Sequence, residues 1–255
     1  MANPSFSLAG RKALVTGASR GIGEALAIGL ANAGADVAAA ARDRSSLAAA
    51  EAAIAAAGRK AIAVAIDVRD AAAIRAGVDT AAQALGGLDI LVNNAGVEEV
   101  RDSLAVDEAL WDRIVDTNLK GAFFCAQAAA RIMAAAQGGA IVNVCSLTSE
   151  VGVPTAVPYG SSKSGLLGMT RALAAEWAAK GIRVNGIGPG YFRTDLTEVF
   201  YRNADWQRAM LAKIPLRRFG RLEDLIGATV FLCSDAAAYI TGQCLYIDGG
   251  YLASI

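Results

Sequence analysis

A tyrosine followed four residues later by a lysine is the pair of residues in this chain best suited to move a proton. Tyr159 and Lys163 are separated by Gly-Ser-Ser. Residues i and i+4 of a helix share a face, so the ammonium group can lie beside the phenol. A positive charge stabilises the phenolate and lowers a phenol pKa from its ordinary value near ~10. The pair therefore predicts a general acid and base, although this spacing also occurs in ordinary surface helices.

A glycine-rich segment near the start of the chain is suited to bind a dinucleotide. The apolar run of residues 13–16 leads directly into Gly17, Gly21 and Gly23. Missing side chains permit a tight turn and a close approach of the backbone to phosphate oxygens. The first N–H groups of the following helix stabilise an anion. Strand, glycines and helix in this order predict a pyrophosphate site, and the alternative is a tight turn with no ligand.

The residues after the second expected strand indicate which dinucleotide binds. A carboxylate at that position binds the ribose 2′-hydroxyl of NAD and repels an additional phosphate. Here Ala41 takes the expected acidic position, Arg42 follows it, and Arg20 lies in the glycine loop. Two guanidinium groups suit the 2′-phosphate of NADP. We therefore predict NADP(H), with NAD(H) as the alternative, because Asp43 would approach the ribose if the strand ended one residue later.

The composition excludes several classes of protein. Basic and acidic residues number 24 each, with no dense basic block, so we expect no nucleic-acid partner. The chain has no histidine, which excludes Ser-His-Asp and Cys-His hydrolases and the commonest zinc sites, and we predict no metal. Its four cysteines lack Cys-x-x-Cys spacing and are expected to be buried thiols. Neither a membrane-length apolar stretch nor a secretory leader is evident, so we expect a cytoplasmic protein with no membrane partner.

Short apolar segments alternate with longer alanine-rich segments along the chain. Strands are expected at 13–15, 37–41, 61–66, 90–93, 140–145, 183–187 and 244–247, and helices at 23–33, 45–57, 70–85, 107–134, 159–179 and 222–234. Strands joined by helices become parallel, and a parallel sheet needs both faces covered. We therefore predict an α/β fold: a single domain over residues 1–255 with a Rossmann-type, doubly wound, seven-stranded parallel sheet in a three-layer α/β/α sandwich.

The segment 194–215 breaks this alternation. It carries aromatic and apolar residues between charged ones and has no evident strand. We expect it to form a lid over the substrate, and the alternative is an amphipathic pair of surface helices.

Together these motifs resemble those of the short-chain dehydrogenase/reductase family, over nearly the whole chain. The segment from Thr16 to Gly23 is similar to the family's cofactor glycine motif, residues 93–96 to the turn that closes its fourth strand, and residues 248–250 to its usual ending. The resemblance implies an oxidoreductase that transfers a hydride between a nicotinamide and a secondary alcohol or ketone. It also implies a homotetramer, and the helices at 107–134 and 159–179 are apolar on more than one side, as subunit interfaces require.

Four residues match the family's catalytic tetrad: Asn118, Ser146, Tyr159 and Lys163. The resemblance implies that Ser146 orients the substrate carbonyl, Tyr159 exchanges the proton, Lys163 lowers the tyrosine pKa and binds the nicotinamide ribose, and Asn118 holds a water. The residues expected to contact the dinucleotide are Gly17, Ser19, Arg20, Gly21, Ile22, Gly23, Arg42, Asp67, Val68, Asn94, Ala95, Gly96, Tyr159, Lys163, Pro189, Gly190, Phe192 and Thr194.

The substrate prediction stays broader. Glu98 and Glu150 lie in loops expected near the pocket and can accept hydrogen bonds from a polyol, while Arg193 can pair with a sugar-acid carboxylate. The alternative is that all three are solvated surface charges. Residues 189–192 and 246–252 resemble those of sugar-acid and polyol dehydrogenases such as gluconate dehydrogenases. Beta-oxoacyl thioester reductases and general carbonyl reductases are the alternatives within the family, and an NADP-binding sensor without turnover is the alternative from another class.

Overall fold

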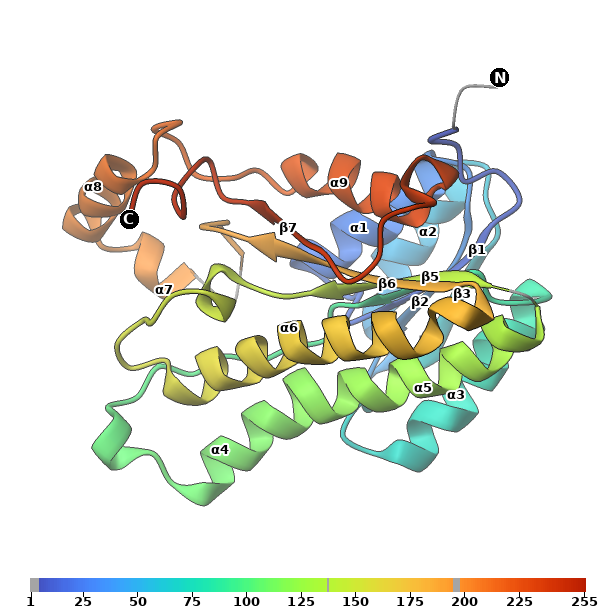
Figure 1. Cartoon of the computed structure of the whole chain (residues 1–255), viewed down its shortest axis with the longest axis horizontal. Helices are drawn as coiled ribbons and strands as arrows, with labels where there is room; N and C mark the ends of the chain where they lie inside the picture. Colours follow the sequence, from blue (N-terminus) through green and yellow to red (C-terminus); the bar gives the residue numbers. More distant parts are fainter. Residues whose placement is uncertain (1–4, 137, 195–197) are drawn as a thin grey trace.

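The computed structural model describes residues 5–136, 138–194 and 198–255. One sheet of seven parallel strands forms its centre, in the order β3-β2-β1-β4-β5-β6-β7 (Figure 1). The strands are β1 (Lys12–Thr16), β2 (Asp36–Ala41), β3 (Ala61–Ala65), β4 (Ile90–Asn93), β5 (Gly139–Val144), β6 (Ile182–Pro189) and β7 (Cys244–Ile247). Each of the seven predicted strands is confirmed to within two residues at either end.

Helices cover both faces of this sheet, as the prediction of a three-layer sandwich requires. They are α1 (Gly21–Asn32), α2 (Ala48–Ala56), α3 (Ala71–Leu85), α4 (Glu108–Val115), α5 (Gly121–Ala135), α6 (Val157–Trp177), α7 (Glu198–Tyr201), α8 (Ala204–Lys213) and α9 (Glu223–Cys233). Helices α1, α2 and α9 lie on one face, and α3, α5 and α6 lie on the other (Figure 1). No helix in the described ranges is both long enough and apolar enough to cross a membrane.

Strand β2 shows how tertiary context decides secondary structure. Its sequence is largely alanine, which has low strand propensity, yet it pairs in parallel with β1 on one side and with β3 on the other. Residues Val37 to Ala40 are all buried because both faces of the sheet are covered. Alternation of strands and helices was therefore a better predictor than residue propensity.

The helix expected at 107–134 is confirmed as one helical run over residues 108–135, but this run is not α-helical throughout. It is divided into α4 and α5 by a π-helical turn, Asp116–Lys120, which contains Asn118. Single π turns inside α-helices occur frequently at functional sites. Periodicity could not reveal this turn, because a π turn keeps the chain helical and none of residues 116–120 is a proline or glycine.

The segment expected to be a lid contains two short helices, α7 and α8, and residues 195–197 of it lie outside the described residues. Tyr201 of α7 contacts Trp206 of α8, with 5.3 Å between ring centroids, and Trp206 also contacts Tyr191 at 5.7 Å. These contacts pack both helices against the end of β6. The lid function itself stays a prediction.

Candidate active site

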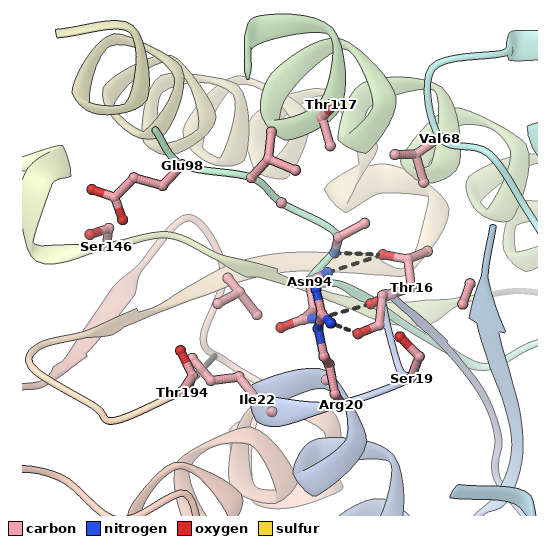
Figure 2. A pocket seen from close by; sticks show the side chains of 18 of the residues that line it. Thr16, Ser19, Arg20, Ile22, Val68, Asn94, Glu98, Thr117, Ser146 and Thr194 are labelled. Atoms are coloured by element: carbon pink, nitrogen blue, oxygen red, sulfur yellow. Dashed lines mark hydrogen bonds between the residues drawn. The ribbon is translucent and has the colours of Figure 1, made fainter. Parts of the chain in front are cut away.

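A cavity of about 380 Å³ opens at the carboxyl ends of the central strands (Figure 2). It lies where the strand order reverses between β1 and β4, the position at which doubly wound sheets bind their ligands. All the residues predicted to contact the dinucleotide line this cavity, and so does Ser146. Of the four tetrad residues, Asn118 is the one that does not line it.

The glycine loop has the geometry that a pyrophosphate requires. Gly17 has a φ of +65°, and a Cβ at Gly23 would lie 2.3 Å from the side-chain nitrogen of Asn94 and 2.3 Å from the carbonyl oxygen of Gly17. Helix α1 begins at Gly21, and Arg20 at its N-cap makes no side-chain capping hydrogen bond. The first N–H groups of α1 therefore lie at the cavity wall without a side-chain cap, which fits an anion.

A polar brace ties the glycine loop to the turn after β4 (Figure 2). Asn94 Nδ2 donates to the carbonyl oxygens of Thr16 and Gly17, both at 3.0 Å. Thr16 Oγ1 accepts from the backbone N–H groups of Asn94 and Ala95, both at 3.1 Å. The Asn94 amide thus holds the loop. Thr16 was missed as a site residue, although a threonine that ends an apolar strand was a usable signal.

Basic side chains outnumber acidic ones where the cavity meets the carboxyl ends of β2 and β3. Arg42 follows the last residue of β2 and lines the cavity, whereas Asp43 does not line it. The Asp43 carboxylate accepts from the backbone N–H of Ser45 at 2.9 Å and from its hydroxyl at 2.7 Å. It therefore caps the 3₁₀ turn Arg44–Leu47.

Asp67 pairs with Arg69 at 3.1 Å, and this hydrogen bond lowers the Asp67 pKa. Arg69 lines the cavity but was not predicted.

Lys163 is held in place by the end of β5. Its side chain belongs to α6, it is only 4% exposed, and its Nζ donates to the carbonyl oxygen of Val144 at 2.7 Å. Nζ lies 5.6 Å from the centroid of the Tyr159 ring, as the spacing of four residues predicted. Burial lowers the pKa of Lys163, and the nearby Cys145 and Glu98 side chains oppose that shift.

The pKa of Tyr159 is shifted in the opposite direction to the expectation that Lys163 lowers it. The pKa of the phenol is raised, first because the hydroxyl is enclosed by the cavity wall and second because the Glu98 carboxylate repels a phenolate. The Ser146 hydroxyl faces the phenol and favours its charged form. Ser146 comes just after β5, and its Oγ accepts from the backbone N–H of Thr148 at 3.2 Å. The serine and the tyrosine therefore meet in the cavity, but the net shift is upward.

Asn118 lies behind the cavity wall and holds the loop that follows β4. Its Oδ1 accepts from the N–H of Val97 at 2.8 Å, and its Nδ2 donates to the carbonyl oxygen of Val97 at 2.9 Å and to Ser162 Oγ at 3.1 Å. Ser162 in turn donates to the carbonyl oxygen of Tyr159 at 2.7 Å. The side-chain amide expected to hold a water is engaged with the protein, and it connects the loop to α6.

The structure separates the three charges that were expected near the substrate. Glu98 lines the cavity. Glu150 is exposed and accepts from the Tyr246 hydroxyl at 2.9 Å. Arg193 pairs with Glu198 at the surface, through bonds of 2.7 and 2.8 Å. Of these three side chains, only Glu98 can reach a ligand in the cavity.

Comparison with known proteins identifies the family. Residues 17–252 match a family model described as enoyl-(acyl carrier protein) reductase. The chain is 40% identical to gluconate 5-dehydrogenase of Gluconobacter oxydans over the full length of both proteins. It is 39% identical to 3-oxoacyl-(acyl-carrier-protein) reductase FabG of Staphylococcus aureus, over 94% of this chain and 97% of that one.

Solved structures agree with this match. A protein from Sinorhizobium meliloti, whose structure is described as that of a short-chain alcohol dehydrogenase, is 68% identical, with a TM-score of 0.97 over 99% of this chain and 100% of that one. A gluconate 5-dehydrogenase from Burkholderia cenocepacia, solved with NADP and tartrate, is 38% identical, with a TM-score of 0.95 over 98% of each chain.

The chain therefore belongs to the short-chain dehydrogenase/reductase family. Membership makes it an oxidoreductase that acts on CH–OH groups.

Proposed function

We propose that this protein transfers a hydride between NADP(H) and a secondary alcohol or ketone, with Tyr159 as the general acid and base. The observation that carries the proposal is the convergence of two groups in one cavity: the N-terminus of α1 without a side-chain cap, and the side chains of Ser146, Tyr159 and Lys163. A bound nicotinamide supplies the hydride or accepts it.

The chain's own residues orient the substrate and move the proton. Ser146 donates a hydrogen bond to the carbonyl oxygen of the substrate and orients it beside the phenol. Tyr159 gives its proton to that oxygen during reduction and takes it back during oxidation. Lys163, fixed by Val144, holds the nicotinamide ribose and stabilises the phenolate as it forms.

Two features support NADP(H) as the cofactor. Arg20 and Arg42 line the cavity, and guanidinium groups suit a ribose 2′-phosphate. The structurally similar gluconate 5-dehydrogenase was solved with NADP. Because Asp43 caps a turn instead of facing the cavity, NAD(H) is the weaker alternative.

The relatives support two substrate classes. The likeness to gluconate 5-dehydrogenase supports sugar acids and polyols as substrates of this protein. The likeness to the 3-oxoacyl reductase supports beta-oxoacyl thioesters, and general carbonyl reduction is a third alternative. We further propose a lid at 194–215, a homotetramer and a cytoplasmic location. The free thiol state of all four cysteines supports a reducing compartment.

One panel of assays tests the proposed function. NADPH and NADH absorbance is followed with gluconate, an acetoacetyl thioester and butanone, for the wild type and for Tyr159→Phe. The variant is expected to lose about 10²- to 10⁴-fold in kcat, because it loses the group that transfers the proton. NADPH affinity, measured by fluorescence titration, is expected to change much less than kcat, because Tyr159 is one of many residues expected to contact the dinucleotide.

The control is Tyr239→Phe, which removes the same atom from a fully exposed ring and is expected to keep full activity. NADPH binding without turnover of any compound in the panel would reject catalysis in favour of a cofactor-binding sensor.

A further inference from the structure

We infer that Glu98 is the specificity-determining residue at the substrate end of the cavity. Its carboxylate accepts a hydrogen bond from a hydroxyl group on the carbon next to the reacting carbonyl. The cavity therefore selects a neutral, hydroxylated ketone or the corresponding vicinal diol, and it rejects a carboxylate at that position. This inference rests on the proposed hydride transfer and gives its substrate class.

The backbone fixes where Glu98 points. Its neighbour Val97 is held by both its N–H and its carbonyl oxygen to the side chain of Asn118, at 2.8 and 2.9 Å. From this anchored loop the Glu98 side chain extends into the part of the cavity where Ser146 lies (Figure 2). Two hydrogen bonds between Val97 and the buried Asn118 amide thus set the position of the backbone that carries Glu98. Such support is typical of a residue whose orientation matters.

No donor from the described part of the chain holds the Glu98 carboxylate. Within the described ranges of the chain, no hydrogen bond or ion pair reaches it, and its one electrostatic neighbour of opposite sign is Lys163. The adjacent Glu99 differs, because Arg101 and Arg113 both donate to it. Carboxylates that are removed from bulk water are normally hydrogen-bonded. The unmet capacity of Glu98 faces the same space as the reacting groups, so a donor on the substrate satisfies it.

The charge at this end of the cavity disfavours an acidic substrate. Lys163 donates to the carbonyl oxygen of Val144, and Arg113, which also lines the cavity, pairs with Glu99. Arg193, the expected partner of a sugar-acid carboxylate, is bound to Glu198 at the surface. A carboxylate beside Glu98 would therefore meet a like charge, because Arg113 and Arg193 are already paired with carboxylates and the charge of Lys163 is already opposed by Glu98 itself. Burial raises the Glu98 pKa, and the positive charge of Lys163 limits that rise.

The test uses three methyl ketones of the form CH₃–CO–CH₂–X, with X as hydroxyl in hydroxyacetone, methyl in butanone and carboxylate in acetoacetate. NADPH oxidation gives kcat and KM for each. Because a hydrogen bond to a charged group gives about tenfold or more in discrimination, the wild type is expected to prefer hydroxyacetone to butanone by that factor. Acetoacetate is expected to be the poorest of the three.

Two substitutions divide the effect into its parts. Glu98→Gln removes the charge, so kcat/KM is expected to fall about tenfold for hydroxyacetone and to rise about tenfold for acetoacetate, each relative to butanone. Glu98→Leu also removes the acceptor and is expected to abolish the preference for hydroxyacetone. Changes of opposite sign on two substrates cannot result from a general loss of folded enzyme.

The matched control is Glu150→Gln, which makes the same change on a carboxylate that binds Tyr246 outside the cavity, and it should leave all three values unchanged. Turnover with the same ratios in wild type and Glu98→Gln would overturn the role of Glu98 and leave the proposed function standing. Failure of the wild type to reduce any of the three ketones, with turnover of gluconate or the acetoacetyl thioester retained, would also overturn the role of Glu98. Failure with every one of these compounds would overturn the proposed function itself.

Discussion

Burial and the Glu98 carboxylate both favour the protonated form of the Tyr159 phenol. A protonated phenol is the form that reduction needs, because it must give its proton to the developing alkoxide. Oxidation needs the phenolate instead, and Glu98 opposes its formation. One carboxylate therefore affects both substrate choice and the pH at which each direction works best.

The pH profile of alcohol oxidation tests this coupling. Oxidation is expected to accelerate as pH rises, because the phenolate fraction grows. In Glu98→Gln one cause of the raised Tyr159 pKa is removed, so the pKa falls and the profile moves to lower pH. The measurement is kcat/KM against pH with 1,2-propanediol and NADP, and a shift to higher pH would contradict the assignment.

Arg42 allows a second test at the scale of single residues. Arg42→Ala is expected to raise the KM for NADPH on the order of tenfold while leaving that for NADH nearly unchanged, since a charge-assisted contact with the 2′-phosphate is lost. Arg44→Ala removes the same charge from an exposed position that does not line the cavity, and it should change neither value. Equal losses with both cofactors would reject the 2′-phosphate contact.

At the scale of elements, the π-helical turn Asp116–Lys120 links α4 and α5 to the active-site loop. Asn118 in this turn is only 1% exposed and makes all its side-chain bonds to Val97 and Ser162. The turn therefore positions the loop that carries Glu98.

Asn118→Ala is expected to lower the free energy of unfolding by about 1–3 kcal/mol, because the partly buried N–H and carbonyl oxygen of Val97 lose their partner and Ser162 loses one of its two hydrogen bonds. The KM for a hydroxylated ketone should rise more than the KM for NADPH, since the loop faces the substrate. Asn118→Asp keeps the acceptor for the Val97 N–H and should recover part of both losses. Chemical denaturation and steady-state kinetics measure the two effects. An unchanged free energy of unfolding in Asn118→Ala would contradict the positioning role of Asn118.

The start of α1 leads to a prediction about packing. Gly23→Ala places a methyl group 2.3 Å from Asn94 Nδ2, so it is expected to cost about 1–3 kcal/mol of stability and to weaken NADPH binding. Gly227→Ala, in α9, meets nothing within 4 Å and is expected to stabilise the protein by about 0.5–1 kcal/mol. Thermal unfolding with and without NADPH distinguishes the two, and equal effects would show that the close approach is not required.

At the scale of the whole molecule, apolar side chains remain exposed on α4 and α6, which belong to the helices expected at subunit interfaces, and on two segments outside these helices. Leu104 is 98% exposed, Trp111 of α4 and Val157 of α6 are 39% and 45% exposed, and Leu245 lies on β7, which ends the sheet. Exposed apolar residues and an uncovered sheet edge are usual where copies of a chain associate.

We therefore expect light scattering at micromolar concentration to give four times the chain mass of 26.1 kDa. A monomeric mass would reject the tetramer.

The sequence by itself determined the features that depend on neighbouring residues. The seven strands follow from short apolar runs, the glycine loop at the cavity wall from glycines between a strand and a helix, and the shared face of Tyr159 and Lys163 from a spacing of four residues. Each of these patterns is contained in a few consecutive residues, which is why it could be recognised without a structure.

Only the tertiary structure decided which side chains face the same space. Glu98, Glu150 and Arg193 had equal standing in the sequence, yet one enters the cavity and two pair with residues elsewhere on the surface. The direction of the Tyr159 pKa shift likewise depends on burial and on a carboxylate 61 positions earlier in the chain. Distances across the fold set burial and electrostatic energies, and separation along the chain does not reveal those distances.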